Sequence, residues 1–169
     1  MASGSGLGTA PAPQAADLRF QKQRVEQVVK AGASWFVWIA ALSVVNSVIG
    51  MAGGGVHFIV GLGVTEVVDV LAHQAGSSGL VLDFVINGFV VGIFLLFWNF
   101  ARKGKSWAFL VGMVLYALDG LLLLSLKDFF SVAFHAYALF RMYGGLKALP
   151  TFRRLEAALA PADAPIVPR

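Results

Sequence analysis

Long apolar runs are the feature that most constrains how this chain can fold. Five of them follow one another, and each approaches or exceeds the roughly 18 to 20 residues that cross the hydrocarbon core of a bilayer. They comprise residues 32–53, 56–73, 80–101, 106–126 and 129–149. The chain is 58% hydrophobic with a mean hydropathy of +0.77, well above what soluble domains show. The sequence therefore predicts an all-α, polytopic membrane protein.

The second apolar run differs from the others because it carries two carboxylates, in the stretch LGVTEVVDVLAH. On a helical wheel its four polar side chains fall within about a third of the circumference. These are Thr65, Glu66, Asp69 and His73. Glycines flank the run on both sides and suit sharp changes of chain direction. We therefore expect residues 56–73 to form an extra amphipathic helix, interfacial or re-entrant on the extracytoplasmic side, and not a span.

The distribution of Lys and Arg supports this topology, because these residues stay on the cytoplasmic side of membrane proteins. If residues 56–73 do not cross, four spans remain, and twelve of the thirteen Lys and Arg residues fall on one side, with Lys127 as the exception. The sequence thus predicts a four-transmembrane-helix bundle in a bacterial inner membrane. Both termini are expected to be cytoplasmic.

Composition predicts the flanking parts of the chain. Residues 1–16 and 161–169 are rich in Ala, Pro and Gly and are expected to be disordered tails. Residues 17–31 and 150–160 place apolar side chains on one helical stripe and basic ones elsewhere, which predicts two short surface helices on the cytoplasmic side. Residues 32–149 between them are expected to form a single membrane domain.

Small residues predict where two helices approach each other closely. In the expected span 80–101, Gly88 and Gly92 have the GxxxG spacing that allows close approach of transmembrane helices. We therefore expect another helix to pack against this part of the span.

Two ionisable side chains are predicted to meet inside the bundle. The last two spans join at a short turn around Lys127, with Asp119 eight residues before it and His135 eight residues after it. At 1.5 Å per residue, both lie about 12 Å from the turn on adjacent antiparallel helices. Four more polar candidates fall in the same outer half: Asn46, Asn87, Asp83 and Tyr116. Together they predict a polar layer near the extracytoplasmic side.

This polar layer has two interpretations. Buried Asn, Ser, Asp and His commonly join helices through hydrogen bonds worth about 0.6 to 2 kcal/mol each, which favours a structural network. Ionisable groups at membrane depth cost roughly 2.5 to 3.5 kcal/mol each, so they also mark sites for ligands, ions or protons. In that case Asp119 and His135 would form a proton-sensitive pair, because histidine changes its charge near neutral pH. Of these two interpretations, we favour the structural network.

A second polar set lies at the extracytoplasmic end, as a lid over the layer or as candidate metal ligands. It consists of Glu66, Asp69, His73 and Asp128. Carboxylate and imidazole groups suit zinc, iron or manganese. The chain has no HExxH or paired ExxH spacing and no cysteine, so the metal signal is weak.

No residue is predicted to be catalytic, because the chain lacks Cys and any GxSxG context for a serine nucleophile. We expect a non-enzymatic scaffold or accessory subunit with room for a lipid or small ligand in the polar outer-half layer, and no cofactor. Its expected partners are the lipid bilayer and either further copies of itself or a larger membrane complex, not nucleic acid. The alternatives are a small transporter or ion- or proton-conducting protein that uses Asp119 and His135 and, third, a metal-dependent membrane enzyme.

Overall fold

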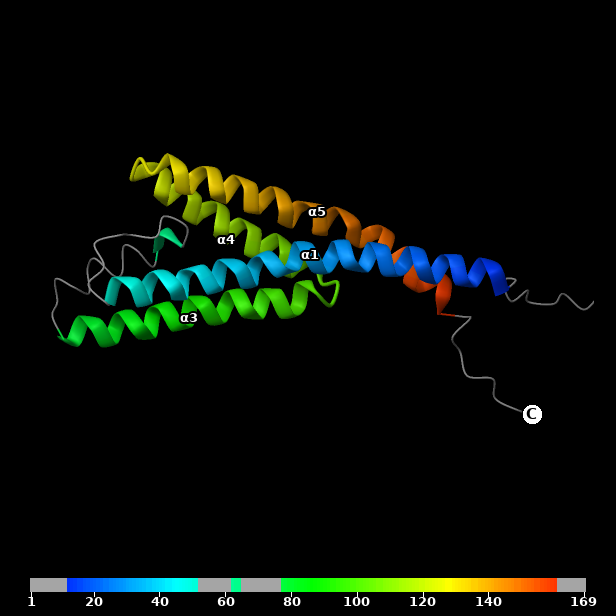
Figure 1. The fold of residues 1–169 in the computed structure, drawn as a ribbon, viewed down its shortest axis with the longest axis horizontal. Helices are drawn as coiled ribbons and strands as arrows, with labels where there is room; N and C mark the ends of the chain where they lie inside the picture. Colours follow the sequence, from blue (N-terminus) through cyan, green and yellow to red (C-terminus); the bar gives the residue numbers. More distant parts are fainter. Residues whose placement is uncertain (1–11, 52–61, 65–76, 161–169) are drawn as a thin grey trace, which may run out of the picture.

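The computed structural model describes residues 12–51, 62–64 and 77–160 of the chain, and the expected all-α class is confirmed there. Four long helices build the structure (Figure 1). They are α1 (Ala12–Met51), α3 (Ser77–Ala101), α4 (Ser106–Ser125) and α5 (Phe129–Leu159). Their ends define an elongated bundle in which successive helices alternate in direction.

The positions of the helix ends show that the chain passes along the bundle once in each helix. The C-terminal end of α1, at Met51, lies at the same end of the bundle as Ser77, where α3 begins (Figure 1). The α3–α4 turn lies at the other end, and the α4–α5 turn returns to the first. The four helices therefore run alternately up and down, which is the order that four antiparallel spans require.

Short turns with defined backbone geometry connect the last three helices. In the α3–α4 turn, Gly104 has a φ of +78°, a left-handed conformation that glycine adopts without strain. In the α4–α5 turn, Lys127 has a φ of +62°. The next residue, Asp128, caps α5: its carboxylate accepts hydrogen bonds from the Ser131 N–H at 3.1 Å and from the Ser131 hydroxyl. This cap explains why α5 begins at Phe129.

The prediction of a separate N-terminal surface helix over residues 17–31 is wrong, because these residues are part of α1. Residues 12–16, expected in the tail, are helical too. Pro13 lies in the first turn of α1, where proline is tolerated, and no proline follows it in this helix. The buried residues Val29, Ala33 and Phe36 follow the i, i+4, i+7 spacing of one helical face across the expected boundary. The same packed face continues on both sides, so the helix does not end there.

The C-terminal surface helix is likewise the last part of α5, which continues through Pro150. Proline lacks an N–H and so removes one intrahelical hydrogen bond. Contacts beyond it hold the helix in place: Arg153 Nη2 donates to the Gly104 carbonyl at 2.9 Å and to the Ser106 hydroxyl at 3.2 Å. The Phe152 ring lies against Gly104. The end of α5 is thereby fixed to the α3–α4 turn.

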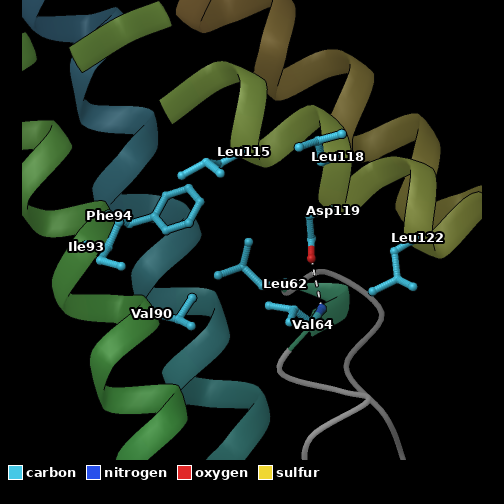
Figure 2. A pocket seen from close by; sticks show the side chains of 9 residues that line it. All are labelled: Leu62, Val64, Val90, Ile93, Phe94, Leu115, Leu118, Asp119 and Leu122. Atoms are coloured by element: carbon cyan, nitrogen blue, oxygen red, sulfur yellow. Dashed lines mark hydrogen bonds between the residues drawn. The ribbon is translucent and has the colours of Figure 1, made fainter. Parts of the chain in front are cut away.

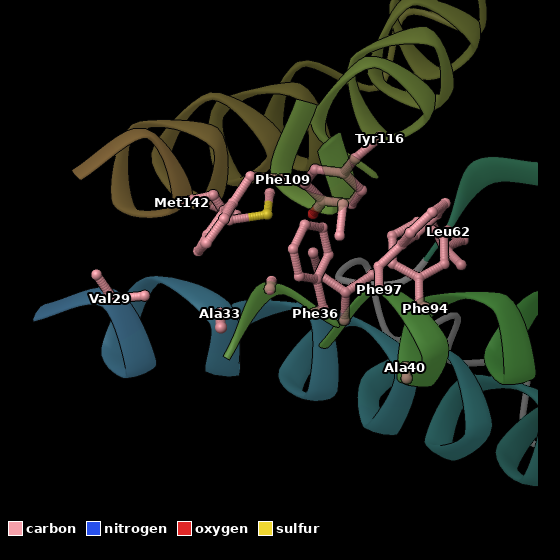
Figure 3. Packing of buried hydrophobic residues seen from close by; sticks show 14 of the residues in the cluster. Val29, Ala33, Phe36, Ala40, Leu62, Phe94, Phe97, Phe109, Tyr116 and Met142 are labelled. Carbon is pink, nitrogen blue, oxygen red and sulfur yellow. The ribbon is translucent and has the colours of Figure 1, made fainter. Parts of the chain in front are cut away.

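Aromatic rings fill the centre of the bundle (Figure 3). The Phe36 ring lies 6.0 to 6.2 Å, centroid to centroid, from the rings of Phe94, Phe97 and Phe109. A Cβ atom at Gly112 would lie 2.5 Å from Phe36 Cε1, so this glycine makes room for the Phe36 ring. Tilted aromatic pairs of this kind add to the free energy of burial.

A close helix approach joins α1 and α5, and it is not where the GxxxG spacing predicted one. A Cβ atom on Gly32 would lie 2.6 Å from Gly145 Cα, and a Cβ atom on Gly145 would lie 2.9 Å from Gly32 Cα. At Gly88 and Gly92, a Cβ atom would meet nothing within 4 Å. In the part of the chain that the structure describes, the expected close contact at Gly88 and Gly92 is therefore absent.

Large apolar side chains cover much of the outside of the bundle. Exposed examples from each helix are Val48, Phe89, Leu96, Val114, Leu121 and Phe140. Among the described residues, two helical stretches are long and apolar enough to cross a membrane, Gln14–Ile49 and Ser106–Ser125, and α3 adds the shorter apolar stretch Val85–Ala101. Soluble monomers rarely expose apolar surface on this scale.

Candidate functional site

The carboxylate of Asp119, on α4, is the centre of the polar site and is only 8% exposed. Its Oδ2 atom accepts a hydrogen bond from the Gly63 N–H, and its Oδ1 atom accepts one from the Val64 N–H, each at 2.8 Å. In Figure 2 the Asp119 side chain extends from α4 directly toward this short helical piece. Asp119 therefore binds two successive backbone donors far from it in the sequence.

A third backbone donor of the same piece is bound from α1. The Leu62 N–H donates to the Ser43 hydroxyl at 3.3 Å, and that hydroxyl donates to the Ile39 carbonyl at 3.0 Å. Gly63 and Val64 are helical, and the first N–H groups of a helix have no partner within the helix itself. Side chains of two other helices thus supply the partners that a local cap would otherwise provide.

His135, on α5, completes the site from the other side of Asp119. Its Nε2 atom lies 2.9 Å from Asp119 Oδ2, so the two residues meet at the place that their distances from Lys127 predicted. Its Nδ1 atom lies 2.8 Å from the Ser131 carbonyl, which can only accept, so Nδ1 carries a hydrogen. Nε2 and Oδ2 are therefore joined by a hydrogen bond that pairs the two buried side chains with each other.

Residues of α4 pack against the imidazole of His135. The Tyr116 ring stacks on it, with centroids 4.0 Å apart and planes inclined by 15°. A Cβ atom at Gly120 would lie 3.2 Å from His135 Cβ, so this glycine allows α4 and α5 to approach here. Tyr116 and His135 are both buried. The position of the imidazole is therefore fixed by packing as well as by hydrogen bonds.

The amide candidates lie between α1 and α3. Asn87 Nδ2 donates to the Ser47 hydroxyl at 3.1 Å, which joins the two helices. Asn46 Oδ1 is buried and has no hydrogen-bond partner among the residues that the structure describes. Asp83 belongs to α3, but its side chain lies outside what is described. The candidates Glu66, Asp69 and His73 also lie outside the described residues, so their role as a lid stays a prediction.

The metal hypothesis gains no support from the described ranges. No group of three or more His, Cys, Asp or Glu side chains in 12–51, 62–64 and 77–160 could hold a metal ion. The candidate Asp128 uses its carboxylate to cap α5. Metal binding by the undescribed candidates stays a prediction.

An apolar pocket of about 330 Å³ lies beside Asp119, between α3 and α4 (Figure 2). Its lining consists of Leu62, Val64, Val90, Ile93, Phe94, Leu115, Leu118, Asp119 and Leu122. Asp119 is the one ionisable residue among the described residues of this lining. Leu115 and Leu118 are exposed, so the pocket adjoins the apolar outside of the bundle.

Comparison of the chain with protein-family models, with curated proteins and with solved structures finds no match. The site is therefore interpreted from its own geometry. The sequence predicted that Asp119 and His135 meet, but not the hydrogen bonds from residues 62–64 to Asp119 and Ser43. Every residue except proline carries a backbone N–H, so the sequence holds no signal for the ones that are bound.

Proposed function

We propose that this chain is an integral membrane protein with four spans that works as a non-enzymatic scaffold or accessory subunit and holds a lipid chain in the pocket beside Asp119. Membrane embedding is supported by the exposed apolar side chains on all four helices. Charge supports the orientation: among the described Lys and Arg residues, Lys127 alone belongs to the end of the bundle where α4 and α5 join. The basic end is the cytoplasmic one.

The hydrogen bonds of Asp119 are the main observation in favour of a non-enzymatic role. Both of its oxygens accept backbone N–H groups, and one of them also faces His135. A general base or nucleophile needs a lone pair directed at a substrate, and here the lone pairs are directed at the protein's own donors. The site is thus suited to fixing residues 62–64 against α1 and α4.

The pocket supports the lipid part of the proposal. Its walls are almost wholly aliphatic, and pockets that bind apolar ligands combine such walls with few polar groups. A single acyl chain matches this chemistry better than a polar solute. Because exposed Leu115 and Leu118 border the pocket, a chain can enter sideways from the bilayer.

A transporter that uses Asp119 and His135 is the second candidate, favoured by the 2.9 Å contact that joins these two ionisable side chains. It requires the carboxylate to release its backbone partners in each cycle. Reconstituted vesicles distinguish the two roles: the transporter predicts pH-dependent flux that Asp119→Asn abolishes, and the scaffold predicts no flux in either protein.

Topology is tested by labelling single cysteines introduced into the native background, which contains none. Lys103→Cys and Leu126→Cys place thiols in exposed turns at opposite ends of the bundle. We expect a membrane-impermeant maleimide to label the Leu126→Cys protein in intact cells. The Lys103→Cys protein should be labelled only after the membrane is opened. Labelling of both positions in intact cells would contradict the four-span topology.

Occupation of the pocket is tested with a spin-labelled fatty acid and the reconstituted protein. Val90→Trp fills the pocket from α3, and Val111→Trp adds the same ring to the exposed face of α4, outside the lining. We expect the immobilised component of the spin-label spectrum to fall in Val90→Trp and to persist in Val111→Trp. Equal immobilisation in both variants would show that the pocket holds no chain.

A further inference from the structure

A groove on the outside of the bundle, between α1 and α5, combines positive charge with apolar walls. Its volume is about 330 Å³, and its lining includes Val28 and Gly32 of α1 and Phe140, Arg141, Gly144 and Lys147 of α5. The groove lies beside the contact of Gly32 with Gly145. A Cβ atom at Gly144 would meet nothing within 4 Å, so this glycine leaves the floor of the groove open.

The two cations of the groove have no partner in the described structure. Arg141 and Lys147 are exposed, and neither makes a hydrogen bond or ion pair with any residue in the described ranges. Among the described residues, the lining contains no carboxylate. Glu26, two residues before Val28 in α1, is paired with Lys30 at 2.6 Å. The groove therefore has an unbalanced positive charge.

The position of Arg141 along α5 makes that charge unusual. Leu149 lies at the level of the α3–α4 turn, because its Cδ2 atom is 3.8 Å from the Cβ position of Gly104. Arg141 is two turns before Leu149, about 12 Å further into the bundle at 1.5 Å per residue. An exposed guanidinium at this depth either extends toward water or binds an anion that comes to it.

We propose that this groove binds the phosphate of an anionic phospholipid, with Arg141 and Lys147 at the headgroup and Phe140 along the acyl chain. The inference rests on the proposed membrane embedding. Arginine pairs well with phosphate oxygens because of its planar fork of donors. Phe140 is 71% exposed beside the groove and offers the apolar surface that a free phosphate ion could not use. Basic pockets between spans on the cytoplasmic side suit anionic headgroups.

Native mass spectrometry of the full chain in non-ionic detergent tests the proposal, with phosphatidylglycerol and phosphatidylcholine as probes. We expect about 25-fold tighter retention of phosphatidylglycerol, because each of the two basic residues contributes on the order of 1 kcal/mol, or about fivefold, toward an anionic lipid. Arg141→Gln with Lys147→Gln should abolish the preference. The matched control, Lys103→Gln with Lys105→Gln, removes the same charge from the α3–α4 turn and should keep it.

A second variant blocks the groove without changing its charge. Gly144→Leu fills the open floor, and Gly92→Leu places the same side chain at an equally open, exposed position of α3. We expect Gly144→Leu to lose phosphatidylglycerol retention and Gly92→Leu to keep it. Inorganic phosphate in excess should not displace the lipid.

Three outcomes would overturn the lipid site: equal retention of both lipids by the native chain, unchanged retention in the Arg141 and Lys147 double variant, or complete displacement by phosphate, which would indicate a simple anion site. Alkaline carbonate extraction separates this failure from that of the proposed function. A chain that stays in the membrane but shows no lipid preference contradicts the groove alone. A chain released by carbonate contradicts membrane embedding as well.

Discussion

Replacing Asp119 by Asn should detach residues 62–64 from the bundle while the four helices stay assembled. The carboxylate accepts hydrogen bonds from the Gly63 and Val64 N–H groups through two different oxygens. An amide offers one oxygen, and its NH₂ group would face another donor. At least one buried N–H is then left without a partner, which costs about 1 to 3 kcal/mol. The attachment of this piece to α4 is therefore weakened, while the bond from the Leu62 N–H to Ser43 is unchanged.

Hydrogen exchange measures this effect directly at the Gly63 and Val64 amides. We expect their exchange to accelerate by roughly one to two orders of magnitude, since 1.4 kcal/mol corresponds to a factor of ten. Asp17→Asn is the matched control, because Asp17 is exposed and, among the described residues, bonds the side chain of Gln21 alone. Unchanged exchange in Asp119→Asn would show that the carboxylate does not hold this piece in solution.

Replacing Gly32 by Ala should disrupt the packing of α1 on α5. The added methyl would lie 2.6 Å from Gly145 Cα and 2.9 Å from Gly145 N, which are backbone atoms that cannot rotate away. Overpacking of this kind typically costs about 1 to 3 kcal/mol, and here the cost should reach the top of that range because two whole helices must separate. We expect the midpoint of unfolding in a denaturing detergent to fall clearly.

The neighbouring glycine Gly144 supplies the control for this substitution. A Cβ atom at Gly144 meets nothing within 4 Å, so Gly144→Ala should leave the free energy of unfolding unchanged or raise it by about 0.5 to 1 kcal/mol through helix propensity. Equal stability of the Gly32→Ala and Gly144→Ala proteins would mean that α1 and α5 do not touch at Gly32 and Gly145.

The sequence was sufficient to predict features that depend on the period of one helix or on residue spacing across one helical hairpin. The apolar runs predicted the helices, and equal distances from Lys127 predicted that Asp119 and His135 meet, as they do at 2.9 Å. Both inferences need only the period of the helix and a short turn. A proton-binding or transport role of this pair stays a prediction.

Features that join distant segments could not be predicted in the same way. The GxxxG spacing of Gly88 and Gly92 is visible in one segment, but the real contact pairs Gly32 with Gly145, which belong to the first and last helices. The binding of the Gly63 N–H by Asp119 was hidden for a related reason, since every residue except proline has a backbone N–H and nothing marks the one that will be used.

The unbroken course of α1 has a mechanical consequence. At 1.5 Å per residue, a helix of 40 residues is a stiff rod of about 60 Å, whereas the 25 residues of α3 span about 37 Å. The rod carries Lys22 and its neighbours at one end and Ser43, which binds the Leu62 N–H, toward the other. Gly32 and Gly145 mark a close contact of this rod with α5, between its two ends. A tilt of α1 about this contact would move Lys22 and Ser43 in opposite directions, so a change at the basic end would reach residues 62–64 through Ser43.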